Sequence, residues 1–192
     1  MIKIYICDNI SSFSEDEYRM TYALMPQSRQ EKVDNLLFND SKVRSVIAFQ
    51  LLQKGLEKDF NIHSPIDFYY NRYGKPFLIN TPAVHFSLSH SDNAVLCIIG
   101  DQNVGIDVED IRSPSVDLIK YCCNDREQHK VFTSMNSDEA FYKIWTQKES
   151  FLKMRGCGIT ENIKNAINNV SITFHTQMFR EKGYIYSWCK ED

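Results

Sequence analysis

Hydrophobic and polar residues alternate along several short stretches of the chain, and this alternation predicts β-strands. In residues 2–7 isoleucine occupies every second position, and in residues 84–89 Val84, Phe86 and Leu88 alternate with histidine and serine. A period of two places the apolar side chains on one face of a strand. We expect further strands at 66–70, 94–99, 104–109, 170–174 and 184–188.

A helical period separates these strands. Val43, Ile47 and Leu51 recur every four residues and predict a helix over about 41–60. Capping residues or prolines mark the starts of other helices, and Ser14 and Asn124 are each followed by a glutamate three positions later. We expect helices from Ser14 to about Met25, from Pro26, from Ser113 to about Cys122, from Asn124, and from Ser137 to Gly156.

The order of these elements occurs twice. A strand, several helices and then extended segments are found in residues 1–103 and again in residues 104–192. This order predicts an α+β protein with two halves of similar plan, each with a small antiparallel sheet packed on helices. Three consecutive strands, 84–89, 94–99 and 104–109, pair most simply as an antiparallel meander.

Composition and charge exclude some partners. Twenty-two basic and twenty-five acidic residues among 192 give a net charge of −3, which offers no field for nucleic acid or an anionic membrane. No apolar run approaches membrane-spanning length, and the start lacks the apolar core of a signal peptide. The six cysteines show no C-x-x-C spacing, which is typical of reduced thiols. We expect a cytoplasmic protein.

The predicted strand VGIDVE, residues 104–109, has two acids on one face. Asp107 and Glu109 are two positions apart, so their side chains point the same way, about 6.6 Å apart along the strand. Gly105 lacks a side chain and lets a backbone or a ligand approach closely. A strand ending in a solvated turn would show the same pattern. Two carboxylates without partners repel each other, so we expect a cation between them.

The helix predicted around residues 141–155 has charges within its apolar stripe. Lys148 falls in the middle of the stripe, Glu149 borders it, and Lys153 lies one turn further along. In the simpler alternative, Lys148 lays its stem over the core and the other two form a surface ion pair. If Glu149 instead joins the two strand acids, three oxygen donors would favour Mg²⁺.

A phosphate-bearing ligand would also need basic groups. Each candidate alone would be an ordinary surface residue, but together they would balance a pyrophosphate and the excess of carboxylates. The candidates are Arg44, Arg72, Lys75, His90, Lys148 and Lys153.

Three sequence blocks in fixed order resemble a known family. FSLSHS at 86–91, VGIDVE at 104–109 and WTQKESFLK at 145–153 are similar to the signature blocks of the 4'-phosphopantetheinyl transferases of the surfactin-synthetase-activating (Sfp) type. GKP at 74–76 fits the block upstream of them. The resemblance implies a monomer whose two halves are related by a pseudo-twofold axis, with the nucleotide held by residues 1–103 and the metal and catalytic helix in residues 104–192.

The resemblance also implies an activity. Such enzymes transfer the 4'-phosphopantetheine arm of coenzyme A to a serine of an apo acyl or peptidyl carrier protein and release adenosine 3',5'-bisphosphate. The implied metal is Mg²⁺, with Mn²⁺ left open, and coenzyme A is the substrate. By analogy alone, we expect the carrier to dock on residues 113–135.

The implied roles of individual residues follow from the matched blocks. Asp107, Glu109 and Glu149 would be metal ligands. Glu149, directly or through water, would accept the serine proton, and Lys153 would stabilise the leaving group. The residues implied in phosphate binding are Lys75, Ser89 and His90 for the nucleotide, and Lys148 and Lys153 for the pyrophosphate.

The second predicted helix departs from the family pattern. Relatives often present several lysines there to the 3'-phosphate of the nucleotide, whereas here Ser28 and Glu31 stand among Arg29 and Lys32. We therefore expect Arg44 to contribute more of that contact.

Three other functions stay open. The chain could be a coenzyme A or nucleotide binding module whose acids hold a structural metal, or a metal-dependent phosphodiesterase. It could also resemble the trimeric carrier-protein synthase with single-half subunits, although 192 residues are long for such a subunit.

Overall fold

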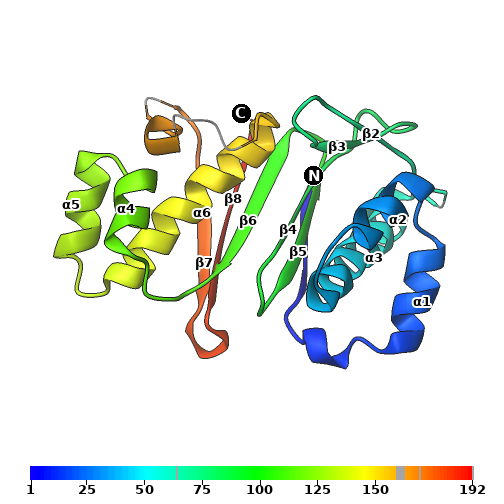
Figure 1. Cartoon of the computed structure of the whole chain (residues 1–192). Coiled ribbons are helices and arrows are strands. Elements are labelled where there is room, and N and C mark those ends of the chain that lie inside the picture. The colour runs from blue at the N-terminus through cyan, green and yellow to red at the C-terminus, as the bar shows by residue number, and fades with distance from the viewer. Residues whose placement is uncertain (64, 159–162, 169, 192) are drawn as a thin grey trace.

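The computed structural model describes residues 1–63, 65–158, 163–168 and 170–191. Two three-stranded sheets lie in the centre of the molecule, with α1–α3 on one side and α4–α6 on the other (Figure 1). Both sheets are antiparallel. This arrangement confirms the predicted α+β class.

The first sheet has the strand order β1-β5-β4. Strand β5 (Val95–Gly100) lies between β1 (Ile2–Cys7) and β4 (His85–His90), and all of its residues are buried. Helix α3 (Asn39–Phe60) packs on this sheet through apolar side chains such as Phe49, as its four-residue period predicts. The core of the first half therefore lies between α3 and β5.

Shorter elements complete the first half. The capping box of Ser14 and Glu17 opens α1, as predicted. The turn between β2 (Phe68–Tyr70) and β3 (Pro76–Leu78) consists of residues 71–75. The remaining elements are η1 (Ile10–Ser12), α1 (Glu15–Ala23), α2 (Gln27–Asp34), β2 (Phe68–Tyr70) and β3 (Pro76–Leu78).

The second sheet has the strand order β6-β8-β7. Strand β8 (Tyr184–Lys190) lies between β6 (Val104–Asp110) and β7 (His175–Phe179), and α6 (Ser137–Arg155) packs on it. The predicted strand at 170–174 is wrong, because the strand that pairs with β8 begins at His175.

A close approach of α6 to β6 depends on Gly105. A Cβ atom built at this position would lie 1.9 Å from the carbonyl oxygen of Ser150 and 2.5 Å from the backbone nitrogen of Met154. Only glycine leaves room for the helix backbone here, as the sequence predicted. The contact fixes α6 directly over the strand that bears the two acids.

The other elements of the second half differ slightly from expectation at their starts. The helix expected from Ser113 is capped by Ser115, and α6 is capped by Asn136 rather than Ser137, because the Asn136 side chain accepts the N–H of Glu139. The remaining elements are α4 (Val116–Cys122), α5 (Asp125–Thr133), η2 (Ile163–Asn165) and η3 (Arg180–Lys182).

The predicted meander is wrong for its third strand. All residues of β6 pair with β8 of the second sheet, so this strand does not extend the first. The other edge of β6 meets serine side chains of β4: Ser87 Oγ accepts the N–H of Ile106 at 3.3 Å, and Ser89 Oγ accepts that of Val108 at 3.2 Å. Hydroxyl groups thus satisfy the strand edge and join the two sheets.

The two sheets follow the same chain order. In each, the first strand of the half pairs with the last, and the last forms a hairpin with the one before it. The predicted division into 1–103 and 104–192 falls in the turn before β6 and stays a prediction. None of the described helices has the length and apolar character needed to cross a membrane.

Candidate active site

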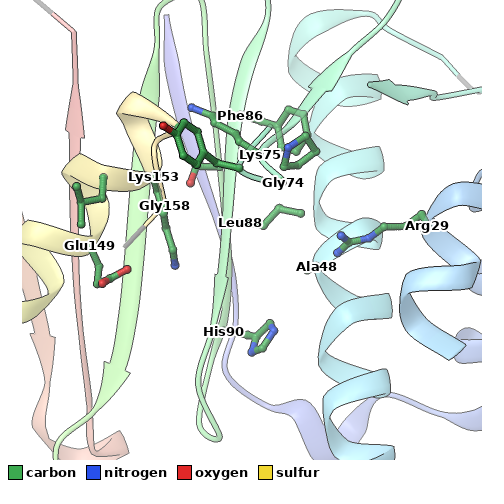
Figure 2. A pocket seen from close by; sticks show the side chains of 15 residues that line it. Arg29, Ala48, Gly74, Lys75, Phe86, Leu88, His90, Glu149, Lys153 and Gly158 are labelled. Atoms are coloured by element: carbon green, nitrogen blue, oxygen red, sulfur yellow. The ribbon is translucent and has the colours of Figure 1, made fainter. Parts of the chain in front are cut away.

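A cavity of about 380 Å³ lies between the two halves. Its walls come from α2, α3, the β2–β3 turn, β4 and α6. Figure 2 shows Glu149 and Lys153 on one side of this cavity and Arg29 on the other. A second cavity of about 260 Å³ adjoins it, because both are lined by Leu88, His90 and the two α6 side chains.

The second cavity brings together three acids from two elements. Asp107 and Glu109 come from β6, and Glu149 comes from α6. Burial, followed by repulsion from Asp107, raises the pKa of Glu149 to about 7, although Lys153 acts in the opposite direction. The same two causes raise the pKa of Glu109. Glu109 and Glu149 therefore lie close enough to Asp107 for its charge to disfavour their ionised forms.

Donor groups hold the two strand acids in place. Lys153 Nζ lies 2.6 Å from Asp107 Oδ1 and donates to Ser89 Oγ at 2.8 Å. Trp145 Nε1 donates to Glu109 Oε1 at 3.0 Å. Lys153 thus pairs with the strand acid rather than with the glutamate on its own helix. Trp145 was not among the sequence-based candidates, and its indole N–H was the available signal.

The acid cluster fits a divalent cation. Asp107 Oδ2 and Glu149 Oε1 are buried and have no hydrogen-bond partner among the residues that the structure describes. Within those residues, no three His, Cys, Asp or Glu side chains form a ready-made metal site. Buried carboxylate oxygens without donors are destabilising, and Mg²⁺ prefers such hard oxygen ligands. A bound cation would satisfy both oxygens.

Lys75 and His90 line the larger cavity from the first half. Lys75 Nζ donates to the carbonyl oxygen of Met154 at 2.8 Å, and burial lowers the pKa of Lys75 to about 8. Desolvation, followed by the positive charges of Lys153 and Arg44, lowers the pKa of His90 to about 4. His90 is therefore neutral at pH 7, with one ring N–H to donate.

Comparisons with known proteins point to one superfamily. Residues 103–191 match the profile of the 4'-phosphopantetheinyl transferase superfamily. The 4'-phosphopantetheinyl transferase Sfp of Bacillus subtilis (strain 168) is 26% identical over 162 residues, which cover 83% of this chain and 72% of that protein. Another 4'-phosphopantetheinyl transferase of Bacillus subtilis is 28% identical over 160 residues, 82% of this chain and 70% of the relative. The chain belongs to the 4'-phosphopantetheinyl transferase superfamily.

A relative from another species is also a 4'-phosphopantetheinyl transferase. The 4'-phosphopantetheinyl transferase gsp of Aneurinibacillus migulanus is 36% identical over 121 residues, 60% of this chain and 49% of that protein. Together the relatives confirm the predicted Sfp type. The superfamily profile covers the second half from the turn before β6 through β8, and this half holds the three acids.

The cations that the first half contributes to the cavities differ from the sequence-based candidates. Arg29 of α2 lines the larger cavity and donates to Ser45 Oγ at 3.2 Å, and burial lowers its pKa. In the described part of the chain, neither Arg44 nor Arg72 lines the two cavities. Arg44 pairs with Asp92 at 3.1 Å, and Arg72 is exposed on the β2–β3 turn. Arg29 lies in the segment for which the resemblance implied a contact with the 3'-phosphate, which was the available signal.

The structure contradicts the assignment of Lys148 to the pyrophosphate. Its side chain is fully buried, and Nζ lies 2.6 Å from Glu127 Oε2. The same ammonium donates to the carbonyl oxygens of Cys122 at 2.7 Å and Lys164 at 2.8 Å. All three donors of the group are used by acceptors in α4, α5 and η2, so none is left for a ligand. In this transferase Lys148 joins α6 to its neighbouring segments.

Proposed function

We propose that the chain transfers the 4'-phosphopantetheine arm of coenzyme A to a serine hydroxyl of an apo carrier protein. One observation supports this most directly. Three acids, together with cations from both halves, line two adjoining cavities. The relatives at 26% and 28% identity are 4'-phosphopantetheinyl transferases, which supports the same activity. The monomeric state and the cytoplasmic location stay predictions.

In the proposed reaction, the serine oxygen of the carrier bonds to the phosphorus of the β-phosphate of coenzyme A. The bond from that phosphorus to the oxygen of the adenosine bisphosphate breaks, and adenosine 3',5'-bisphosphate leaves. The serine proton moves to the Glu149 carboxylate, directly or through water. Burial and repulsion from Asp107 raise the pKa of Glu149 to about 7 in the protein without metal, and a bound Mg²⁺ would lower it and favour the carboxylate form that accepts the proton.

Lys153 has two roles in this proposal. In the free protein it neutralises Asp107, at 2.6 Å. Its side chain lies at the boundary of the two cavities, so it can also stabilise the negative charge that develops on the leaving oxygen. A cation already in place at the reacting centre needs little reorganisation during the reaction.

Asp107, Glu109 and Glu149 would hold the metal, which we propose is Mg²⁺. A bound Mg²⁺ supplies Lewis acidity to the phosphate oxygens. The support is the pair of buried carboxylate oxygens that have no donor among the described residues.

Lys75, His90 and Arg29 would hold the phosphates of the nucleotide. Lys75 and Arg29 provide positive charge, whereas neutral His90 provides a hydrogen bond. The alternative, a coenzyme A binding module whose acids hold a structural metal, would use these groups and the three acids, but it would not need Lys153 as a cation for a leaving group.

The proposed carrier surface is formed by α4 and α5, within residues 113–135. Apolar side chains are exposed on these two helices and just beyond them, and such side chains favour contact with a partner. They are Val116, Leu118, Tyr121, Phe132 and Met135.

Intact-protein mass spectrometry tests the proposal. The protein is incubated with coenzyme A, Mg²⁺ and each of several apo carrier proteins, and with coenzyme A alone. We expect a carrier to gain the mass of the phosphopantetheine arm only in the complete mixture. Binding of coenzyme A without any mass gain would favour a binding module, and cleavage of coenzyme A without a carrier would favour a phosphodiesterase.

A further inference from the structure

The turn between β2 and β3 is organised by one side chain, Asn71. Its Oδ1 atom accepts the backbone N–H groups of Tyr73 at 2.9 Å and Lys75 at 3.0 Å. Tyr73, Gly74 and Lys75 all line the larger cavity. The Asn71 acceptor therefore sets the shape of a wall of that cavity.

The donor of the same side chain reaches the other half of the molecule. Asn71 Nδ2 donates to the carbonyl oxygen of Gly156 at 2.7 Å, 85 residues along the chain. Gly156 ends α6 in the left-handed conformation, with φ 65°. A Cβ atom built at Gly156 would lie 2.8 Å from Lys75 Cδ and 3.1 Å from Asn71 Nδ2. The turn and the helix end are thus in direct contact.

Lys75 makes a second bond to the same helix end. Its Nζ atom donates to the carbonyl oxygen of Met154 at 2.8 Å. The last carbonyl groups of a helix lack intrahelical donors and form the negative end of its dipole, so side-chain donors stabilise them. Two side chains of the first half therefore cap the helix that bears Glu149 and Lys153.

These two bonds respond differently to a ligand. A phosphate in the cavity would attract the Lys75 ammonium, because phosphate is a stronger acceptor than a carbonyl oxygen, so the length of the bond to Met154 depends on where the ligand lies. The Asn71 amide lines neither cavity in the described part of the chain, although its partner Gly156 lines the larger one, and we expect its bond to Gly156 to persist when the ligand is bound. Among the described residues, the Asn71 bond is then the hydrogen bond between the turn and the end of α6 that does not involve the ligand-binding ammonium.

We propose that Asn71 is a positioning residue of the transferase, which holds the nucleotide-binding turn against the end of the catalytic helix while Lys75 contacts phosphate. The proposal rests on the proposed function. Without this bond, Lys75 and the residues of α6 would no longer be held at a fixed separation, and coenzyme A would lose contacts made at the same time from both halves.

Two substitutions separate the donor of Asn71 from its acceptor. Asn71→Asp keeps an oxygen for the N–H groups of Tyr73 and Lys75 but replaces the donor to Gly156 with a second oxygen. Asn71→Ala removes both functions. Asn9→Asp makes the same chemical change at an exposed position outside both cavities and is the matched control.

Steady-state kinetics and calorimetry give the first readout. We expect Asn71→Asp to raise the KM for coenzyme A and its Kd about tenfold, the size of effect typical for a lost hydrogen bond with an acceptor left unpaired. We expect kcat and the KM for the carrier to change less than threefold, and Asn9→Asp to behave like wild type. An unchanged Kd for coenzyme A in Asn71→Asp would overturn the proposal.

Hydrogen exchange gives a readout that does not depend on activity. The amides of Tyr73 and Lys75 should stay protected in Asn71→Asp and exchange faster in Asn71→Ala, whereas in both variants the end of α6 should exchange faster. Faster exchange throughout the protein, with all kinetic constants impaired together, would show a purely structural role and overturn the proposal. If wild type binds no coenzyme A, the proposed function fails, while the exchange data still report whether Asn71 holds the turn and helix together.

Discussion

The two halves share one plan but differ in what their long helices bury. Helix α3 covers the first sheet with a buried face that includes Phe49 and Leu52. Helix α6 covers the second sheet, yet it buries Lys148, Glu149 and Ser150. The first half thus holds a conventional apolar core, whereas the second places charge inside the protein.

The difference shows how the fold tolerates a helix with buried charges. Burying a charge without a partner is costly. Helix α6 belongs to two apolar clusters, one around Phe141 and one around Phe151 and Leu152, and these hold both ends of the charged segment. The first half contributes cations to the cavity from α2 and the β2–β3 turn, outside its own core. The first half therefore contributes positive charge to the cavities and the second half contributes negative charge, except for Lys153.

The largest expected effect comes from the buried acid of α6. Glu149→Gln should lower kcat about 10²-fold or more, because it removes the proposed base and a metal ligand. The Kd for coenzyme A measured without metal should change less than threefold. Transfer to an apo carrier is measured by intact-protein mass.

The first half offers a matched control for that substitution. Glu57→Gln changes an exposed glutamate near the end of α3, and it should leave kcat unchanged. Near-normal turnover of Glu149→Gln at saturating Mg²⁺ would eliminate Glu149 as the base and remove the functional contrast between the two helices.

A second substitution tests the buried lysine of α6. Lys148→Met breaks a buried ion pair with Glu127 and leaves two carbonyl oxygens without their donor, so the free energy of unfolding should fall by about 3 kcal/mol. Lys54→Met, which removes an exposed lysine of α3 bonded to Gln50, should change it by less than about 0.5 kcal/mol. Urea denaturation measures both values.

Binding data decide between the structural role of Lys148 and the phosphate role that its sequence block implies. The folded Lys148→Met protein should bind coenzyme A within twofold of wild type. The double variant with Glu127→Gln should regain part of the lost stability, since no unpaired carboxylate remains. A tenfold weaker affinity together with unchanged stability would instead restore the phosphate role.

Local patterns in the sequence predict most elements but few of their partners. The alternation of isoleucines gives β1, and the four-residue period gives α3 within two residues of its observed start. The prediction of a meander was wrong because periodicity identifies a strand but not the strand with which it pairs. The partner of β6 is β8, about 80 residues away, and the edge toward β4 is satisfied by serine hydroxyls that resemble ordinary outward-facing polar residues.

The prediction of the active site was limited in the same way, because the sequence shows the spacing of residues but not the packing of distant segments. The spacing of Asp107 and Glu109 correctly places both on one side of β6, and Gly105 explains why α6 can lie against that strand. The helical period also places Lys148 in the buried stripe of α6. The helical period could not show that α4 and α5 cover Lys148, because the position of these helices depends on packing between distant segments. The side of α6 that faces the cavity was therefore only partly predictable.

The smallest of the expected effects concerns the cations of the first half. Arg29 lines the cavity, whereas Arg72 is exposed on the turn. Arg29→Met should raise the Kd for coenzyme A about tenfold, because one charge-assisted hydrogen bond contributes about 1.5 kcal/mol. Arg72→Met removes the same charge and should change the Kd less than twofold. Calorimetry at two salt concentrations separates a direct contact between Arg29 and phosphate from long-range attraction by positive charge. Salt screens the long-range attraction, and a loss of that attraction alone would reduce the affinity for coenzyme A equally in both variants. Equal losses in the two variants would mean that the first half acts through its overall charge rather than through a defined phosphate site.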